Sequence, residues 1–127
     1  MPKLLIVDDE PENIELLARR LSRRGFAVVS ATSAEEGIAK AASEKPDVVL
    51  MDIKMPVVDG FEATRRLKAR AETRHIPVIA LTAHAMQEDR DQAVAAGADE
   101  YETKPVDLDR LLTKIESLRS RDRQGAG

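Results

Sequence analysis

Short runs of apolar residues alternate along the chain with longer stretches in which apolar residues recur every three or four positions. The short runs are typical of buried strands, and the longer stretches have the spacing of helices that bury one side. We expect strands at 3–7, 27–31, 47–51, 78–81 and near 99–102, and helices at 11–24, 34–43, 61–70, 87–95 and from Asp107 onward. Five strand–helix pairs in succession predict an α/β fold, a (βα)5 domain with a doubly wound, five-stranded parallel sheet.

Residues at the ends of these segments agree with the helix predictions. Pro11 lies in the first turn of the first helix and Gly25 follows its end, Ser33 can cap the second helix, and Gly97 ends the fourth. The last helix carries an apolar stripe of Leu108, Leu111, Leu112, Ile115 and Leu118. The polar tail at 121–127 is expected to fray, which places the domain at residues 1–120.

Polar residues stand at the carboxyl ends of four predicted strands. Asp8 and Asp9 follow the first strand, Asp52 the third, Thr82 the fourth and Lys104 the fifth. Because the carboxyl ends of parallel strands share one edge, where open α/β sheets bind ligands, we expect these side chains to converge. Three carboxylates repel one another, and a divalent cation together with a lysine would neutralise them. The pattern favours metal-assisted phosphoryl chemistry, in which a carboxylate can act as the nucleophile toward phosphorus.

Each of these residues alone has a simpler explanation. Asp8 and Asp9 can simply cap the first helix, where the helix dipole favours acidic side chains. Asp52 can be an ordinary loop acid, Thr82 can be a helix cap or a turn hydroxyl, and Lys104 can be a solvated charge. Their occurrence together at four strand ends favours a site. A nucleotide- or flavin-binding loop is disfavoured, since the loop after the first strand is acidic and no glycine-rich phosphate-binding motif is present.

Composition excludes several other classes of protein. A net charge of −3 argues against a nucleic-acid-binding domain, and the absence of cysteine excludes disulfides and thiolate sites. No apolar stretch is long enough to span a membrane. With 43% hydrophobic but only 2% aromatic residues, the core must be built from aliphatic side chains. We expect a cytoplasmic protein with neither nucleic acid nor membrane among its partners.

Four stretches of the chain together resemble the receiver domain of two-component response regulators. The resemblance covers nearly the whole chain and implies a flavodoxin-like strand order of 2-1-3-4-5. The stretches are Leu5–Glu10, Leu50–Pro56 with Asp59-Gly60, Ile79–Ala83 and Gly97–Pro105.

The resemblance implies that Asp52 is a phosphoacceptor. Its donor would be a histidine kinase or a histidine phosphotransfer protein, and the reaction would require Mg²⁺, with Mn²⁺ as a substitute. Asp9, Asp52 and the backbone carbonyl of Lys54 would ligate the ion, and Asp8 would act through a water. The protein would be a phosphoprotein signalling module rather than an enzyme, capable only of its own phosphotransfer and autodephosphorylation.

The resemblance also implies a switch. Thr82, Ala83 and Lys104 would bind the phosphoryl group, and Tyr101 would move inward as Thr82 turns toward it. The bond between Lys104 and Pro105 is expected to be cis, which would aim the lysine into the crevice.

The resemblance further implies that two side chains next to the expected site tune how long the phosphoryl group survives. Lys54 lies two residues after Asp52, and His84 two residues after Thr82. Exchanging both should change the lifetime of the phosphoryl group without abolishing phosphorylation. The simpler explanation for His84 is a partly exposed loop histidine.

The same resemblance implies two surfaces at which partner proteins bind. The donor is expected to contact Asn13, Leu16 and Val106, and a downstream protein is expected to bind the face formed by the helix at 87–95, the fifth strand and the last helix. The helix at 87–95 is rich in alanine and therefore has few large anchors. We expect a monomer or a weak, phosphorylation-dependent dimer.

The main prediction is a single-domain response regulator that changes its protein contacts through Thr82 and Tyr101. One alternative is a receiver excised from a hybrid histidine kinase, and another is an interaction scaffold that works without phosphorylation. A Mg²⁺-dependent phosphatase is disfavoured, because Asp8 and Asp9 are adjacent where such enzymes usually have Asp-x-Asp.

Overall fold

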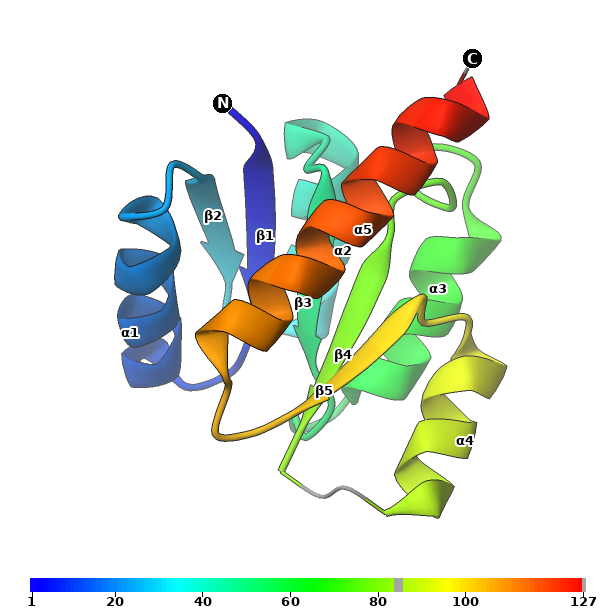
Figure 1. Cartoon of the computed structure of the whole chain (residues 1–127). Helices are drawn as coiled ribbons and strands as arrows, with labels where there is room; N and C mark the ends of the chain where they lie inside the picture. The colour runs from blue at the N-terminus through cyan, green and yellow to red at the C-terminus, as the bar shows by residue number, and fades with distance from the viewer. Residues whose placement is uncertain (84–85, 127) are drawn as a thin grey trace.

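A computed structural model shows a central sheet with helices on both faces (Figure 1). It describes residues 1–83 and 86–126, of which 121–126 are described by their backbone alone. The elements are β1 Lys3–Val7, α1 Pro11–Ser22, β2 Ala27–Ala31, α2 Ala34–Glu44, β3 Val48–Asp52, α3 Gly60–Ala69, β4 Val78–Thr82, α4 Gln87–Ala96, β5 Glu100–Thr103 and α5 Leu108–Ala126.

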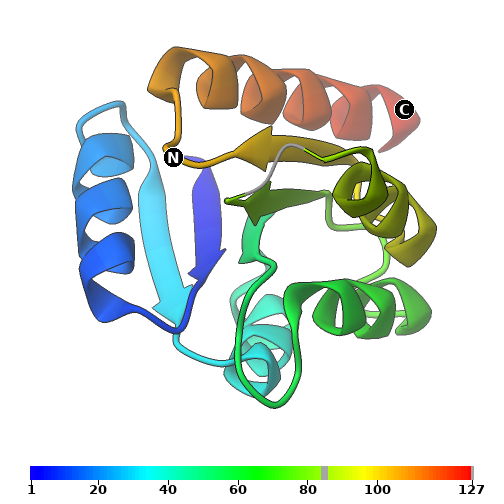
Figure 2. The ribbon, with the colours of Figure 1, turned by 90° about the horizontal axis from the view of Figure 1, so that it is seen from below.

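All five strands are parallel and lie in the order β2-β1-β3-β4-β5, which confirms the predicted fold and strand order. Helices α1 and α5 cover one face of the sheet, and α2, α3 and α4 cover the other (Figure 2). Because every crossover helix brings the chain back to start the next strand in the same direction, all five strands end at one edge.

Alternating residues of the strands supply the two halves of the core. In β1, Leu4 and Ile6 pack under α1 and α5, whereas Leu5 and Val7 pack against α2 and α3. Strands β3 and β4 are buried at every position, as expected for central strands covered on both faces. The stripe of α5 is anchored by Leu111, Ile115 and Leu118, so the last helix belongs to this core.

The ends of several helices have the caps that the sequence predicts. The Ser33 hydroxyl accepts a hydrogen bond from the backbone of Glu36 at 3.2 Å, Pro11 is the first residue of α1, and Gly97 ends α4 with a φ of 101°. This left-handed conformation costs a glycine little, because it has no Cβ.

Two helix ends differ from the sequence prediction by more than one residue. Helix α1 ends at Ser22 rather than at residue 24, since the chain turns through Gly25, with a φ of 91°, to begin β2. Helix α5 continues to Ala126, through most of the segment expected to fray. No helix in the described part of the chain is long and apolar enough to cross a membrane.

Candidate functional site

The candidate site lies at the edge of the sheet where the strands end. Asp8 and Asp9 directly follow β1, Asp52 and Thr82 are the last residues of β3 and β4, and Lys104 directly follows β5. Asp52 is in register with Leu81, and Thr82 with Thr103, so the strand ends are level with one another. The predicted convergence of these residues is therefore present in the structure.

Three carboxylates form a tight cluster at this edge. Asp8, Asp9 and Asp52 each offer one oxygen, and these oxygens all lie within 4.8 Å of one another. Asp8 and Asp52 are buried, with 4% and 6% of their surface exposed, and Asp9 is half-buried. One oxygen of Asp8 also accepts a hydrogen bond from the backbone of Glu10 at 2.9 Å. Carboxylate oxygens are the hard ligands that Mg²⁺ prefers, so this donor set fits such an ion.

Lys104 supplies the positive charge that faces the cluster. Its Nζ lies 3.2 Å from Oδ2 of Asp8 and 3.1 Å from Oδ1 of Asp52. Its backbone N–H donates to the carbonyl of Thr82 at 2.7 Å, and the peptide bond to Pro105 is cis, as the resemblance implied. One lysine against three ionised carboxylates leaves a net charge of about −2, which is the charge that a divalent cation would balance.

The pKa values of the two central groups reflect this crowding. Burial raises the pKa of Asp52, the charges of Asp8 and Asp9 raise it further, and the contact with Lys104 offsets only part of the effect. Burial on its own would lower the pKa of Lys104, but the hydrogen bonds and charges of Asp52 and Asp8 outweigh it and raise that pKa. The lysine therefore stays charged at neutral pH.

The backbone after Asp52 is held by the start of α3. The N–H of Gly60 donates to the carbonyl of Ile53 at 2.9 Å, and the N–H of Ile53 donates to the carbonyl of Leu81 at 3.0 Å. A Cβ on Gly60 would lie only 2.2 Å from the carbonyl oxygen of Asp52. In the sequence, Gly60 stands out only as part of the Asp59-Gly60 stretch, because a close approach of two backbones leaves no recognisable pattern in the sequence. The side chain of Lys54 is exposed beside this turn.

Thr82 and Tyr101 lie on neighbouring strands and contact each other. Thr82 is buried, and Tyr101 is half-buried on the side of β5 that faces α4. Burial and the charge of Asp89 raise the pKa of Tyr101, although a hydrogen bond with Thr82 and the charge of Arg90 act in the opposite direction. Ala83 is exposed next to Thr82. His84, the second residue expected to tune the phosphoryl group, lies outside the described residues.

The three residues expected to contact a donor line one pocket. Asn13 and Leu16 of α1 and Val106 of the loop before α5 border a cavity of about 260 Å³. Asp8 and Lys104 also line this cavity, so it opens directly onto the carboxylate cluster. The residues from α1 and from the loop, about ninety positions apart in sequence, are brought together as predicted, while their role in docking is a proposal taken up below.

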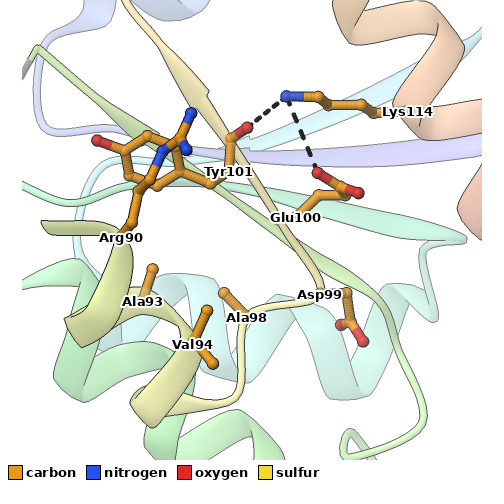
Figure 3. A pocket seen from close by; sticks show the side chains of 8 residues that line it. All are labelled: Arg90, Ala93, Val94, Ala98, Asp99, Glu100, Tyr101 and Lys114. Atoms are coloured by element: carbon orange, nitrogen blue, oxygen red, sulfur yellow. Dashed lines mark hydrogen bonds and ion pairs between the residues drawn. The ribbon is translucent and has the colours of Figure 1, made fainter. Parts of the chain in front are cut away.

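A second groove lies between α4 and the β5–α5 side of the molecule (Figure 3). Its volume is about 290 Å³, and the side chains that line it are mainly small or charged. It coincides with the face expected to bind a downstream partner. The lining residues are Arg90, Ala93, Val94, Ala98, Asp99, Glu100, Tyr101 and Lys114.

Comparison with known proteins gives one consistent result. The family model of the response regulator receiver domain matches residues 4–116. Protein PilH of Pseudomonas aeruginosa is 45% identical over 118 residues, which cover 93% of this chain and 98% of PilH. Some other curated relatives are longer, and the match covers 49% of one and 26% of another.

Two solved structures extend the comparison. Chemotaxis protein CheY4 of Vibrio cholerae is 29% identical with a TM-score of 0.87, over 93% of this chain and 98% of that one. The receiver domain of a sensor histidine kinase from Pseudomonas aeruginosa, solved with a magnesium ion coordinated in its active site cleft, is 32% identical with a TM-score of 0.86, over 94% of this chain and 98% of that one. The fold, the acidic edge of the sheet and the family match agree, and the chain belongs to the response regulator receiver domains of two-component signalling.

Proposed function

We propose that Asp52 accepts a phosphoryl group from a phosphohistidine on a histidine kinase or a histidine phosphotransfer protein. The observation that carries this proposal is the position of the Lys104 ammonium group, within 3.2 Å of both Asp8 and Asp52. A lysine in this position can pair with an oxygen of a phosphoryl group attached to Asp52. Membership of the receiver family and the nearby cluster of carboxylates support the same proposal.

In the proposed reaction, a carboxylate oxygen of Asp52 forms a bond to phosphorus. The bond from phosphorus to the donor's histidine nitrogen breaks, and the nitrogen keeps the electron pair. Phosphoryl transfer depends on in-line placement and on neutralising the equatorial oxygens. Lys104 binds one of these oxygens, and the Thr82 hydroxyl and the backbone N–H of Ala83 bind others.

The carboxylate cluster fits a divalent ion at this site. Asp9, Asp52 and the carbonyl of Lys54 would hold Mg²⁺ or Mn²⁺, with Asp8 acting through a water. When bound, the ion supplies positive charge to the phosphoryl oxygens. A magnesium ion in the cleft of the related sensor kinase receiver supports this assignment.

The new charge on Asp52 then changes the protein's contacts. Thr82 turns toward the phosphoryl group, Tyr101 adjusts with it, and the groove between α4 and the β5–α5 side presents a different surface to a downstream protein. Differential contacts at Thr82 and Tyr101 provide the coupling free energy that such a switch requires. Lys54 and His84 tune the lifetime of the phosphoryl group. A cytoplasmic location and a weak, phosphorylation-dependent dimer belong to the same proposal.

Intact mass spectrometry after incubation with Mg²⁺ and acetyl phosphate tests the assignment of Asp52. We expect one phosphoryl adduct that needs the metal and is absent from Asp52→Asn. Asp91→Asn, which removes an exposed acid on α4, is the matched control and should be labelled as the wild type is.

Two results would contradict the proposal. An adduct that survives in Asp52→Asn would place the nucleophile elsewhere. The absence of any adduct, with acetyl phosphate and with a histidine donor alike, would favour a scaffold that works without phosphorylation.

A further inference from the structure

The ring of Tyr101 is held by contacts with helix α4 as well as by its place on β5. On the side toward α4 it packs against a small apolar cluster that contains Ala93 and Ala96 of α4 together with Phe61 of α3. The guanidinium of Arg90, one turn earlier on α4, lies over the ring at 5.5 Å from its centroid (Figure 3). This distance is within the range of a cation–π interaction, about 6 Å.

The backbone of Tyr101 is held independently of its ring. Tyr101 pairs with Ala80 of β4, and its carbonyl accepts a hydrogen bond from Nζ of Lys114 on α5. Nζ of Lys114 also lies 3.9 Å from a carboxylate oxygen of Glu100 (Figure 3). It lies 3.0 Å from Oε2 of Glu102 as well, so Lys114 is anchored to the strand. Because the backbone of Tyr101 is fixed between β4 and α5, we expect a conformational change at this residue to be a rotation of its side chain.

In the described part of the chain, helix α4 contributes only small side chains to the apolar cluster beside this strand. Among its residues only Ala93 and Ala96 are buried, and Val94, its largest aliphatic residue, is 72% exposed. An alanine buries little apolar area, so a single aromatic contact is a large part of what ties α4 to β5. The contact between Arg90 and Tyr101 therefore links the position of the helix to the orientation of the ring.

We propose that Arg90 is a positioning residue that holds the Tyr101 ring inward beside Thr82 and so couples α4 to the switch. This inference rests on the proposed function, in which Thr82 and Tyr101 respond to the phosphoryl group on Asp52. A contact that favours the inward ring also favours, by linkage, whichever state of the site prefers that orientation. Because the proposed switch pairs the inward ring with the phosphorylated site, Arg90 raises the rate at which the unphosphorylated protein accepts a phosphoryl group.

The chain offers a direct reporter for this test. Tyr101 is its only tyrosine and it has no tryptophan, so tyrosine fluorescence reports on residue 101 alone. Quenching by acrylamide, a neutral collisional quencher, measures how accessible the ring is. We expect stronger quenching in Arg90→Met, which keeps the aliphatic stem but removes the cation, and an intermediate value in Arg90→Lys. Arg65→Met, which removes an exposed arginine of α3 paired with Glu62, should match the wild type.

The second measurement is the rate of labelling by acetyl phosphate with Mg²⁺. We expect the labelling rate of Arg90→Met to be about two- to fivefold lower than that of the wild type, which is the effect of losing a cation–π contact at a partly exposed site. The labelling rate of Arg65→Met should be unchanged. Because Arg90 and Arg65 are both exposed, we expect all three variants to fold, and circular dichroism melts verify this.

The outcomes separate this inference from the proposed function. Equal quenching in Arg90→Met and the wild type overturns the inference, and so does stronger quenching with an unchanged labelling rate, because the helix would then not be coupled to the site. If the wild type takes no phosphoryl group, the proposed function fails, and the quenching comparison alone decides whether Arg90 holds the ring.

Discussion

Glu102 is a carboxylate buried in the layer between β5 and α5. Only 2% of its surface is exposed, and it is in register with the apolar Leu81. Its Oε1 lies 2.9 Å from the guanidinium of Arg110, and its Oε2 lies 3.0 Å from Nζ of Lys114. Burial alone would raise the pKa of Glu102, but the hydrogen bonds to Lys114 and Arg110 outweigh it and hold the pKa below its ordinary value of 4.5. The carboxylate is therefore ionised in the folded protein at neutral pH.

The lowered pKa gives Glu102→Gln a pH-dependent effect on stability. A carboxyl whose pKa is lower in the folded state stabilises the fold above its unfolded pKa of about 4.5 and loses that contribution as the pH falls through its folded pKa. Because both cations are partly exposed and can be hydrated, we expect a loss of about 1–2 kcal/mol at pH 7. Urea unfolding at pH 7 and near pH 3.5 measures the change.

The difference between Glu102→Gln and the wild type should narrow on acidification. Glu15→Gln, which breaks an exposed pair with Arg19, is the control and should change little at either pH. A difference of the same size at both pH values would mean that the loss comes from the hydrogen-bonding pattern of the amide and not from the missing charge of Glu102.

At the scale of elements, the packing of α3 against the end of β3 determines where Asp52 stands. A methyl group on Gly60 would lie 2.2 Å from the carbonyl oxygen of Asp52 and 2.7 Å from Cα of Ile53, and both atoms belong to the backbone. Gly37 of α2 is an instructive comparison, since a methyl group there would meet only side-chain atoms of Val7, at 2.7 and 2.9 Å. At Gly37 the strain falls on the side chain of Val7, whereas at Gly60 it falls on the backbone of β3, which cannot move without shifting the neighbouring strands.

Gly60→Ala is therefore expected to damage the site as well as the fold. We expect Gly60→Ala and Gly37→Ala each to lose about 1–3 kcal/mol of stability, the usual cost of overpacking. Only Gly60→Ala should also weaken Mg²⁺ binding, by tenfold or more, because it displaces the backbone that carries Asp52 and the Lys54 carbonyl. Isothermal titration calorimetry measures the affinity, and urea unfolding measures the stability. Equal Mg²⁺ affinities in the two variants would show that α3 does not position the site.

At the scale of the whole molecule, the cavity beside the carboxylate cluster is assembled from distant parts of the chain. Residues of α1, of β1 and β4 and of the loop before α5 surround it, and Leu16 is exposed at its border. A single exposed leucine is ordinary on a protein surface. Leu16 lies where the cavity opens toward Asp8 and Lys104. A donor protein that reaches the site would contact it there, whereas a small donor such as acetyl phosphate would not.

Leu16→Asp separates these two kinds of donor. We expect transfer from a histidine kinase or phosphotransfer protein to slow by about tenfold, the effect of losing a contact of some 1.4 kcal/mol. Labelling by acetyl phosphate should be unchanged, because that donor needs no docking surface. Val94→Asp, which alters an exposed apolar residue on α4, is the matched control. Slower labelling with both donors would indicate damage to the site itself, and unchanged transfer from the protein donor would rule Leu16 out of docking.

Much of this architecture could be predicted from the amino-acid sequence. Apolar runs of strand length separated by amphipathic stretches indicated a parallel sheet, and the acids, threonine and lysine at the strand ends indicated one shared site. Both predictions depend on local patterns, and parallel strands bring their carboxyl ends to one edge regardless of loop detail. The strand order came from the family resemblance and not from the pattern. The end of α1 was misjudged by two residues, because capping signals at helix ends are weak and several residues can serve.

Other features were decided only by tertiary structure. The close approach of Gly60 to Asp52, the burial of Glu102 between two cations and the position of Arg90 over Tyr101 leave no periodic signal in the sequence. In each case the partner lies on another element, and the contact exists only once the helices have packed on the sheet. The sequence by itself determined which chemical groups reach the edge of the sheet. Packing alone decided how firmly Asp52 and Tyr101 are held there, since that depends on distances of a few ångströms between elements that local patterns do not encode.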